Sequence, residues 1–169
     1  MTQRNNNKGF SLVELLVVIA IMAVAVSLVS YSFVSVYRAR SKRAAETLDA
    51  VISQCKIDSM SGLDCALEVA LDDGNYYVNL YRIDESGNMN LYKTEKLASD
   101  RLSITADSDS IEDDPLIIRF NSSDGSISSA VIGTTDYLES ASTLMLTLSS
   151  TGTHTITLYK NTGEHVLDA

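Results

Sequence analysis

The apolar positions of the chain are concentrated near its N-terminal end. From Leu15 to Tyr37, twenty-three consecutive residues carry no charge. At about 1.5 Å per residue they would form a helix of roughly 34 Å, enough to cross a hydrocarbon core of about 30 Å. Serines dilute the second half, but a helix tolerates them because each hydroxyl can bond back to a backbone carbonyl. A buried helix of a soluble protein is the alternative; the uninterrupted length favours a membrane-spanning helix.

Beyond Tyr37 the pattern becomes that of an amphipathic helix. Apolar residues recur at spacings of three and four, and charged side chains occupy the other faces. The apolar positions are Ala44, Ala45, Leu48, Val51, Ile52 and Cys55. Ser61-Gly62 predicts the end of the helix, because glycine readily adopts the left-handed conformation of a C-terminal cap. We therefore expect one continuous helix of about 50 residues whose second half packs on a domain.

The remainder of the chain alternates apolar and polar residues in the manner of strands. The first such segment contains Leu63, Cys65, Leu67, Val69 and Leu71. Further strands are predicted at Tyr76–Ile83, Met89–Tyr92, Leu102–Thr105, Leu116–Phe120, Ser126–Ile132, Leu144–Leu148, Thr155–Tyr159 and Glu164–Leu167. Glycine-containing turns separate several of them. The predicted fold class is α+β, a long N-terminal helix packed on an antiparallel β domain of two sheets or one curved sheet.

A short polar stretch with Arg4 and Lys8 precedes the apolar run. A secretory signal peptide also begins with a basic region, but its apolar region has only about 7–15 residues before a small-residue cleavage site. Glu14 lies at the start of the run, where a simple anchor gains nothing from it. An ionisable group costs about 2.5–3.5 kcal/mol at the centre of a membrane helix and less near its end. Glu14 is therefore a candidate functional residue.

The segment Lys8–Ile21 resembles the processing and methylation motif of type IV prepilins and pseudopilins, with Gly9, Phe10, Glu14 and the apolar run in that order. The resemblance covers fourteen residues. It implies that a prepilin peptidase cuts between Gly9 and Phe10 and N-methylates Phe10. Glu14 would then be the fifth residue of the mature chain, where the family keeps its glutamate.

Glu14 has a physical partner in this arrangement. A cut after Gly9 leaves a free amine at Phe10, and in a helical core without water each charge needs an opposite partner. The Glu14 carboxylate can meet the amine of a neighbouring subunit and so set the axial register of a fibre. The alternative is that Glu14 snorkels toward the lipid headgroups.

The resemblance implies four segments and one orientation. The segments are a leader (residues 1–9), a membrane and fibre-core helix (10–37), its amphipathic continuation (38–61) and a β globular domain (62–169). The chain would be a single-pass protein of the cytoplasmic (inner) membrane with its globular domain outside, and afterwards part of a periplasmic or extracellular filament. The basic segment Arg38–Arg43 lies on the other side of the apolar run from the leader. Because Lys and Arg favour the cytoplasmic side of a membrane, this segment competes with Arg4 and Lys8 for that side. The mid-helix proline common in the family is missing, since no proline lies between Phe10 and Ser61.

Two short segments narrow the resemblance to minor subunits. Ile117–Phe120 followed by Gly125–Ile127 is similar to a strand, glycine turn and strand of H-type minor pseudopilins, and Thr155–Glu164 is similar to their closing hairpin. A major pilin remains the alternative. Subunits of pilus, type II secretion and DNA-uptake (competence) filaments share the same kind of N-terminal motif, so the motif does not distinguish among these filaments.

The resemblance also implies the partners: prepilin peptidase, other pilin or pseudopilin subunits, the inner-membrane assembly platform with its ATPase, and membrane lipid. The formal net charge of −9, from 13 basic and 22 acidic residues, argues against direct binding of nucleic acid. No cofactor is expected.

No catalytic residue and no metal site is predicted. His154 and His165 have no companion ligand at a suitable spacing, which favours ordinary surface histidines. The acidic stretch Asp107–Asp114 departs from a calcium-binding EF-hand loop at Ile111, so a solvated acidic loop is the better interpretation. Two functions outside filaments stay open: a membrane-anchored binding ectodomain that is not polymerised, and a secreted enzyme with an unusual signal peptide.

The two cysteines, Cys55 and Cys65, fall on apolar faces of the helix and of the first strand. Outside the cytoplasm they can form a disulfide that closes a short loop. The alternative is two buried thiols that act as small apolar side chains. A sequence with only two cysteines has no disulfide pattern that could decide between a bond and two free thiols.

Overall fold

The computed structural model describes residues 11–99 and 102–168, and for residues 28–35 and 98–99 it describes the backbone alone. The chain divides into two compact units, one ending at Val36 and the other running from Tyr37 to Ala169. Helix α1 contributes to both units, and all the strands belong to the second. The predicted leader and Phe10 lie outside the described residues.

Helix α1 runs from Leu12 to Met60. At its end the N–H of Leu63 donates to the carbonyl of Asp58 at 3.1 Å, and the N–H of Gly62 donates to the carbonyl of Ser59 at 3.0 Å. Gly62 has a φ of 84°. These two bonds around a left-handed residue form a Schellman motif, which satisfies the last carbonyls of a helix. The helix end predicted at Ser61-Gly62 is confirmed.

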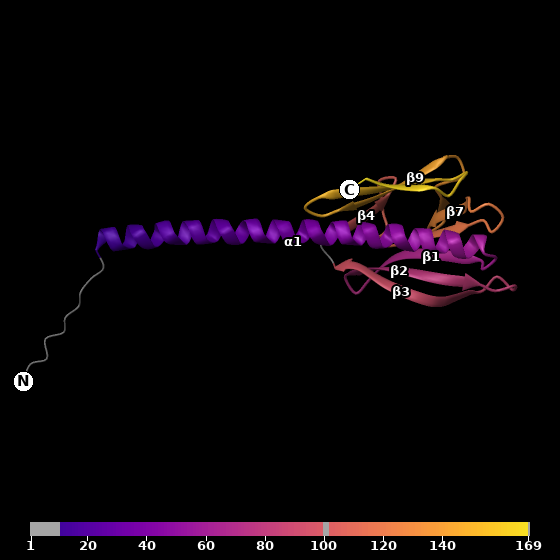
Figure 1. Cartoon of the computed structure of the whole chain (residues 1–169), viewed down its shortest axis with the longest axis horizontal. Coiled ribbons are helices and arrows are strands. Elements are labelled where there is room, and N and C mark those ends of the chain that lie inside the picture. Colours follow the sequence, from indigo (N-terminus) through magenta and orange to yellow (C-terminus); the bar gives the residue numbers. More distant parts are fainter. Residues whose placement is uncertain (1–10, 100–101, 169) are drawn as a thin grey trace, which may run out of the picture. The chain divides into compact units, whose positions relative to one another are not determined.

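The second half of α1 packs through the face that its periodicity predicted. The six apolar residues of that face are all buried: Ala44, Ala45, Leu48, Val51, Ile52 and Cys55. Each large aliphatic side chain buried in this way contributes about 1.5–3 kcal/mol relative to exposure. Figure 1 shows the strands of the domain gathered around this part of the helix. The helix is therefore a structural part of the β domain.

The first sheet has six strands in the order β3-β2-β1-β6-β7-β8, and all neighbours are antiparallel. The strands are β1 (Cys65–Asp72), β2 (Asn75–Ile83), β3 (Met89–Ser99), β6 (Leu116–Phe120), β7 (Ile127–Ile132) and β8 (Thr135–Asp136). Strand β3 is an edge strand and is longer than the predicted Met89–Tyr92. The extension carries Lys93, Glu95 and Lys96, charged side chains of the kind that keep sheet edges from pairing with other chains.

The second sheet has five strands in the order β11-β10-β9-β4-β5, again with antiparallel neighbours. They are β4 (Ser103–Ala106), β5 (Asp109–Ser110), β9 (Thr143–Ser149), β10 (Thr153–Tyr159) and β11 (His165–Asp168). Alternate residues of β9 and β10 are buried, including Leu144, Leu146 and Ile156. Of the two predicted arrangements, the structure therefore has two sheets.

Two turns, one from each sheet, meet at the end of α1. The N–H of Ile127, after the β6–β7 turn, donates to the carbonyl of Lys160, in the β10–β11 turn, at 2.8 Å. Gly125 and Gly163 face each other there, with φ angles of 71° and 59°. A methyl group added at Gly125 would lie 2.8 Å from Sδ of Met60, and one added at Gly163 would overlap the backbone carbonyl oxygen of Gly125. Only glycine fits this close approach with a left-handed backbone.

Two details differ from the sequence prediction. Leu63 is 44% exposed and lies in the turn after α1. The stretch Asp107–Asp114 is not simply a solvated loop, because it contains β5 and the buried Ile111. The carboxylate of Asp107 accepts the backbone N–H of Met145 at 2.9 Å, which fastens the stretch to β9.

Candidate functional site

The start of α1 carries a reciprocal cap. The N–H of Ser11 donates to Oε2 of Glu14 at 3.1 Å, and the N–H of Glu14 donates to Oγ of Ser11 at 3.2 Å. This is the capping box formed when serine precedes a helix and glutamate follows three residues later. The carboxylate also lies at the positive end of the helix dipole. The sequence interpretation of Glu14, as an intermolecular partner or a carboxylate that snorkels to the headgroups, did not include this cap, although the spacing of Ser11 and Glu14 predicts it.

The cap holds the Glu14 carboxylate against the N–H of Ser11, the second residue after the predicted cut. Ser11 is the first described residue, and Gly9 and Phe10 lie outside the described part of the chain. Cleavage between Gly9 and Phe10 therefore stays a prediction. In the single subunit, Glu14 already bonds to the N–H one residue beyond the predicted new terminus.

Helix α1 exposes a long run of apolar side chains from Leu12 to Val26, with Glu14 as its one ionisable residue. Every residue from Ser11 to Ser27 is exposed, and Leu12 reaches 79%. The hydroxyl of Ser27 donates to the carbonyl of Ala23 at 2.6 Å, as expected for a serine in an apolar helix. Large exposed apolar surfaces mark contact with other proteins or with membranes. Within the described part of the chain, no helix has the length and apolarity that crossing a membrane requires.

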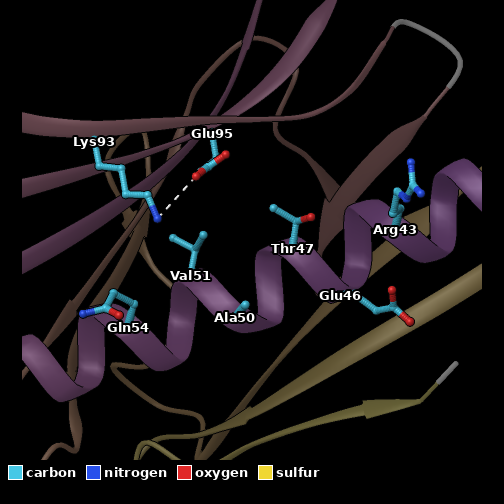
Figure 2. A pocket seen from close by; sticks show the side chains of 8 residues that line it. All are labelled: Arg43, Glu46, Thr47, Ala50, Val51, Gln54, Lys93 and Glu95. Carbon is cyan, nitrogen blue, oxygen red and sulfur yellow. Dashed lines mark ion pairs between the residues drawn. The ribbon is translucent and has the colours of Figure 1, made fainter.

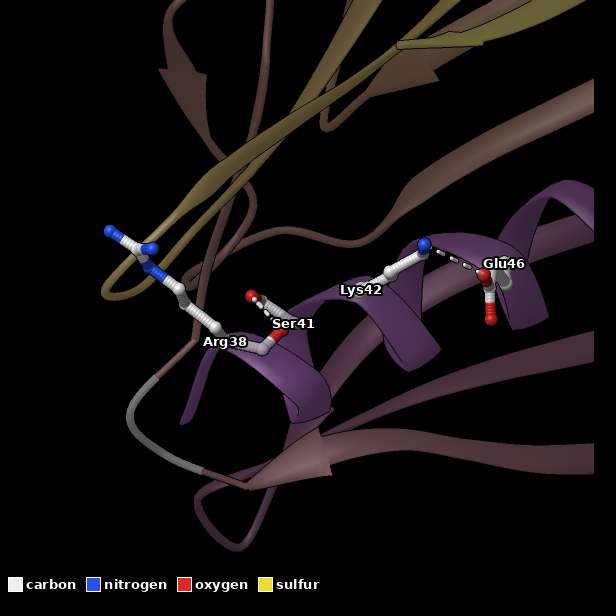
Figure 3. A network of polar contacts seen from close by, with 4 residues as sticks. All are labelled: Arg38, Ser41, Lys42 and Glu46. Carbon is white, nitrogen blue, oxygen red and sulfur yellow. Dashed lines mark hydrogen bonds and ion pairs between the residues drawn. The ribbon is translucent and has the colours of Figure 1, made fainter. Parts of the chain in front are cut away.

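Four exposed cations follow the apolar segment: Arg38, Arg40, Lys42 and Arg43. Figure 3 shows the Arg38 guanidinium extending away from the helix, whereas Lys42 turns toward Glu46. Nζ of Lys42 lies 3.9 Å from Oε1 of Glu46, and the Arg40 guanidinium lies 5.9 Å from the ring centroid of Tyr37. Exposed pairs of this kind contribute roughly 0–1 kcal/mol, so the segment can engage external anions at little cost.

The two cysteines are brought together at the other end of α1. Their sulfur atoms lie 2.6 Å apart, and both residues are buried. The thiol of Cys55 donates a hydrogen bond to Cys65, which raises the pKa of Cys55 and lowers the pKa of Cys65. The positions predicted for both on apolar faces are confirmed.

His165 connects β11 to α1. Its Nε2 lies 2.9 Å from Oγ of Ser53 and 3.5 Å from Oδ1 of Asp49. In a hydrolase triad, serine and aspartate contact opposite nitrogens of the histidine. Here both contact Nε2, and Nδ1 is buried without a partner among the described residues. These polar contacts connect β11 to α1. The surface location predicted for His165 is wrong, since its side chain is only 13% exposed.

A groove lies between α1 and the edge strand β3 (Figure 2). Its lining residues are Arg43, Glu46, Thr47, Ala50, Val51, Gln54, Lys93 and Glu95. Lys93 and Glu95, both on β3, pair with each other on one side of the groove, with Nζ and Oε1 3.3 Å apart. Among the described residues, no group of three or more His, Cys, Asp or Glu is placed to hold a metal ion. The two positive and two negative side chains give the groove no preference for either sign of charge.

Comparison with known proteins finds one similarity at the start of the chain and another in the fold. Residues 4–30 match the family model described as the prokaryotic N-terminal methylation motif. A crystal structure of the type IV minor pilin FimU from Pseudomonas aeruginosa has a TM-score of 0.54 at 14% identity, over 79% of this chain and 91% of FimU. A second crystal form gives 0.51 at 14% identity, over 76% and 92%. A search of curated protein sequences finds no match.

These comparisons confirm two predictions. The structural likeness, at this low identity, establishes the fold, and the predicted α+β architecture is correct. The motif match includes Gly9, Phe10 and Glu14, the residues on which the prepilin resemblance was based. The chain therefore carries a prokaryotic N-terminal methylation motif ahead of a pilin-like fold.

Proposed function

We propose that the protein is a structural subunit, and a minor one, of a type IV pilus, type II secretion or DNA-uptake filament. The observation that carries the proposal is a methylation motif on a helix whose second half is built into a pilin-like β domain. The first half of the same helix exposes apolar side chains that need lipid or other helices around them. FimU, to which the fold is similar, is itself a minor pilin.

Processing is the first step of this function. A prepilin peptidase cuts between Gly9 and Phe10 and methylates the new amine of Phe10. Before the cut, residues 10–37 anchor the chain in the cytoplasmic membrane, with the leader inside and the β domain outside. Removal of Arg4 and Lys8 changes the formal charge from 13 − 22 = −9 to 11 − 22 = −11.

Glu14 guides the next step, in which the subunit joins the filament. The amine of Phe10 and the carboxylate of Glu14 both enter a core without water, where an unpaired charge costs several kcal/mol. The amine of one subunit meets the Glu14 carboxylate of its neighbour and fixes the axial register. The capping box supports this, because it already holds the carboxylate toward the start of the helix.

Helix packing supplies the rest of the assembly. Exposed apolar side chains exchange lipid for neighbouring helices, and small residues such as Ala20, Ala23 and Ala25 allow close approach. A separate assembly platform and its ATPase drive the helices out of the bilayer. Before assembly, the segment Arg38–Arg43 can hold anionic lipid headgroups beside the membrane, an attraction worth about 1 kcal/mol per cation.

The variant Gly9→Leu tests the processing site. A bulky side chain in place of glycine should block the peptidase, so the leader stays attached and filament incorporation falls to background. The measurement is the intact mass of the protein from host membranes, read beside Asn7→Leu, which adds similar bulk two residues earlier and should be processed normally. Efficient cleavage of Gly9→Leu would contradict the site.

A further inference from the structure

We propose that Cys55 and Cys65 are joined by a disulfide in the mature protein, so that the last turns of α1 are covalently fastened to the first residue of β1. The bond rests on the proposed function in one respect, the location of the β domain in an oxidising compartment outside the cytoplasm. The geometry that carries it is independent of the compartment.

The fold places the two sulfur atoms within reach of each other without help from a bond. They are 2.6 Å apart, compared with about 2.0 Å in a disulfide. The Schellman motif after Met60 reverses the chain, so that β1 begins directly beneath the last turns of the helix. Cys55 and Cys65 are 0% and 1% exposed, and their neighbours in the core hold both side chains in place.

In the folded domain, the groups around the two cysteines lower the pKa of Cys65. The Tyr92 hydroxyl lies 3.7 Å from Sγ of Cys65 and donates to the carboxylate of Asp58 at 2.7 Å. The Arg82 guanidinium lies 4.8 Å from the centroid of the Tyr92 ring. The hydrogen bond from Cys55 lowers the pKa of Cys65, although burial acts in the opposite direction. Cys65 is therefore the more acidic of the two thiols in the folded domain.

The reaction is a thiol–disulfide exchange with an oxidised disulfide donor, either a protein dithiol oxidase or glutathione disulfide. The thiolate of one cysteine attacks one donor sulfur, and the other donor sulfur leaves as a thiolate. The second cysteine then loses its proton and attacks Sγ of the first, which releases the second donor sulfur. Two electrons and two protons pass from the cysteines to the donor. Because both sulfurs are shielded in the folded domain, the donor reacts before β1 and β3 close over α1.

The chain offers a direct test, because trypsin cuts after Lys56, between the two cysteines. Full-length protein in detergent is unfolded, reduced and refolded in a glutathione buffer; free thiols are then blocked with iodoacetamide. We expect Ala44–Lys56 to be linked to Ile57–Arg82 and to separate on reduction. Reduction should also lower the melting temperature by on the order of 10 °C. Two separately alkylated peptides from refolded protein would overturn the inference.

The double variant Cys55→Ala/Cys65→Ala is the control, and its melting temperature should not respond to reductant. The same digest of protein from host membranes, alkylated at once, separates this inference from the proposed function. Free thiols in a chain that has lost its leader overturn the disulfide and leave the function standing. Linked peptides in a chain that keeps its leader support the disulfide and contradict the function.

Discussion

Replacing Glu14 by glutamine is expected to lower incorporation into filaments about tenfold or more. Glutamine can still complete the capping box with Ser11, because its side chain also accepts the N–H at the helix start. It cannot neutralise the amine of an incoming Phe10. Leaving one member of a buried ion pair without its partner costs about 3–5 kcal/mol, far beyond the factor of ten that about 1.4 kcal/mol represents. The measurement is the ratio of subunit in sheared filaments to subunit in membranes.

The matched control is Ser11→Ala, which removes the serine hydroxyl that caps the helix and keeps the carboxylate. It should lower helix stability by about 1 kcal/mol and leave most incorporation intact. Normal incorporation of Glu14→Gln combined with a strong defect in Ser11→Ala would mean that Glu14 acts as a cap, and the intermolecular pair would have to be abandoned.

Gly163→Ala is expected to have the largest effect on the stability of the β domain. The added Cβ would overlap the carbonyl oxygen of Gly125, and this contact is with backbone that cannot rotate away. The residue would also keep a φ of 59°, which costs about 1–2 kcal/mol for a residue with a side chain. We expect a total loss of about 3–5 kcal/mol, and therefore a fall in melting temperature of roughly 10 °C or more.

Gly87 provides the comparison, because it has a φ of 84° but nothing within 4 Å of an added Cβ. Gly87→Ala should lose only the backbone cost, and the difference between the two variants measures the clash between the two turns. Equal losses in thermal unfolding would show that the contact between Gly125 and Gly163 does not hold the sheets together.

Much of the helical part could be predicted from the sequence, because its signals are local. The spacing of Leu48, Ile52 and Cys55 identifies the buried face, and Gly62 ends the helix through a motif that involves only nearby residues. The capping box of Ser11 and Glu14 is equally local, because its signature is a serine followed three residues later by a glutamate.

The strands were predicted best where one face is buried. Leu116–Phe120 alternates cleanly and forms β6 with the predicted bounds. Strand β3 was predicted too short. Its segment Lys93–Lys96 lies on a sheet edge and consists of polar and charged residues, so it does not alternate between apolar and polar positions. Strands β5 and β8 have two residues each, too few to show a period of two. Such strands form because their neighbours offer backbone partners.

Contacts between distant segments could not be predicted. Ser53 and His165 are 112 residues apart, and only the packing of β11 on α1 brings them together. The same holds for Gly125 and Gly163, which come from turns of different sheets. A single sequence contains no signal for such pairs, because each depends on the final arrangement of the layers.

The most direct test of the central proposal is the intact mass and N-terminal sequence of the protein taken from its host's membranes. We predict a chain that begins with N-methylated Phe10 and retains Glu14 as its fifth residue. A chain that still carries residues 1–9 in a host with an active prepilin peptidase would contradict processing as a pilin and indicate an anchored ectodomain. A chain that begins beyond Tyr37 would contradict it as well, because the apolar helix would then have been removed as a signal peptide.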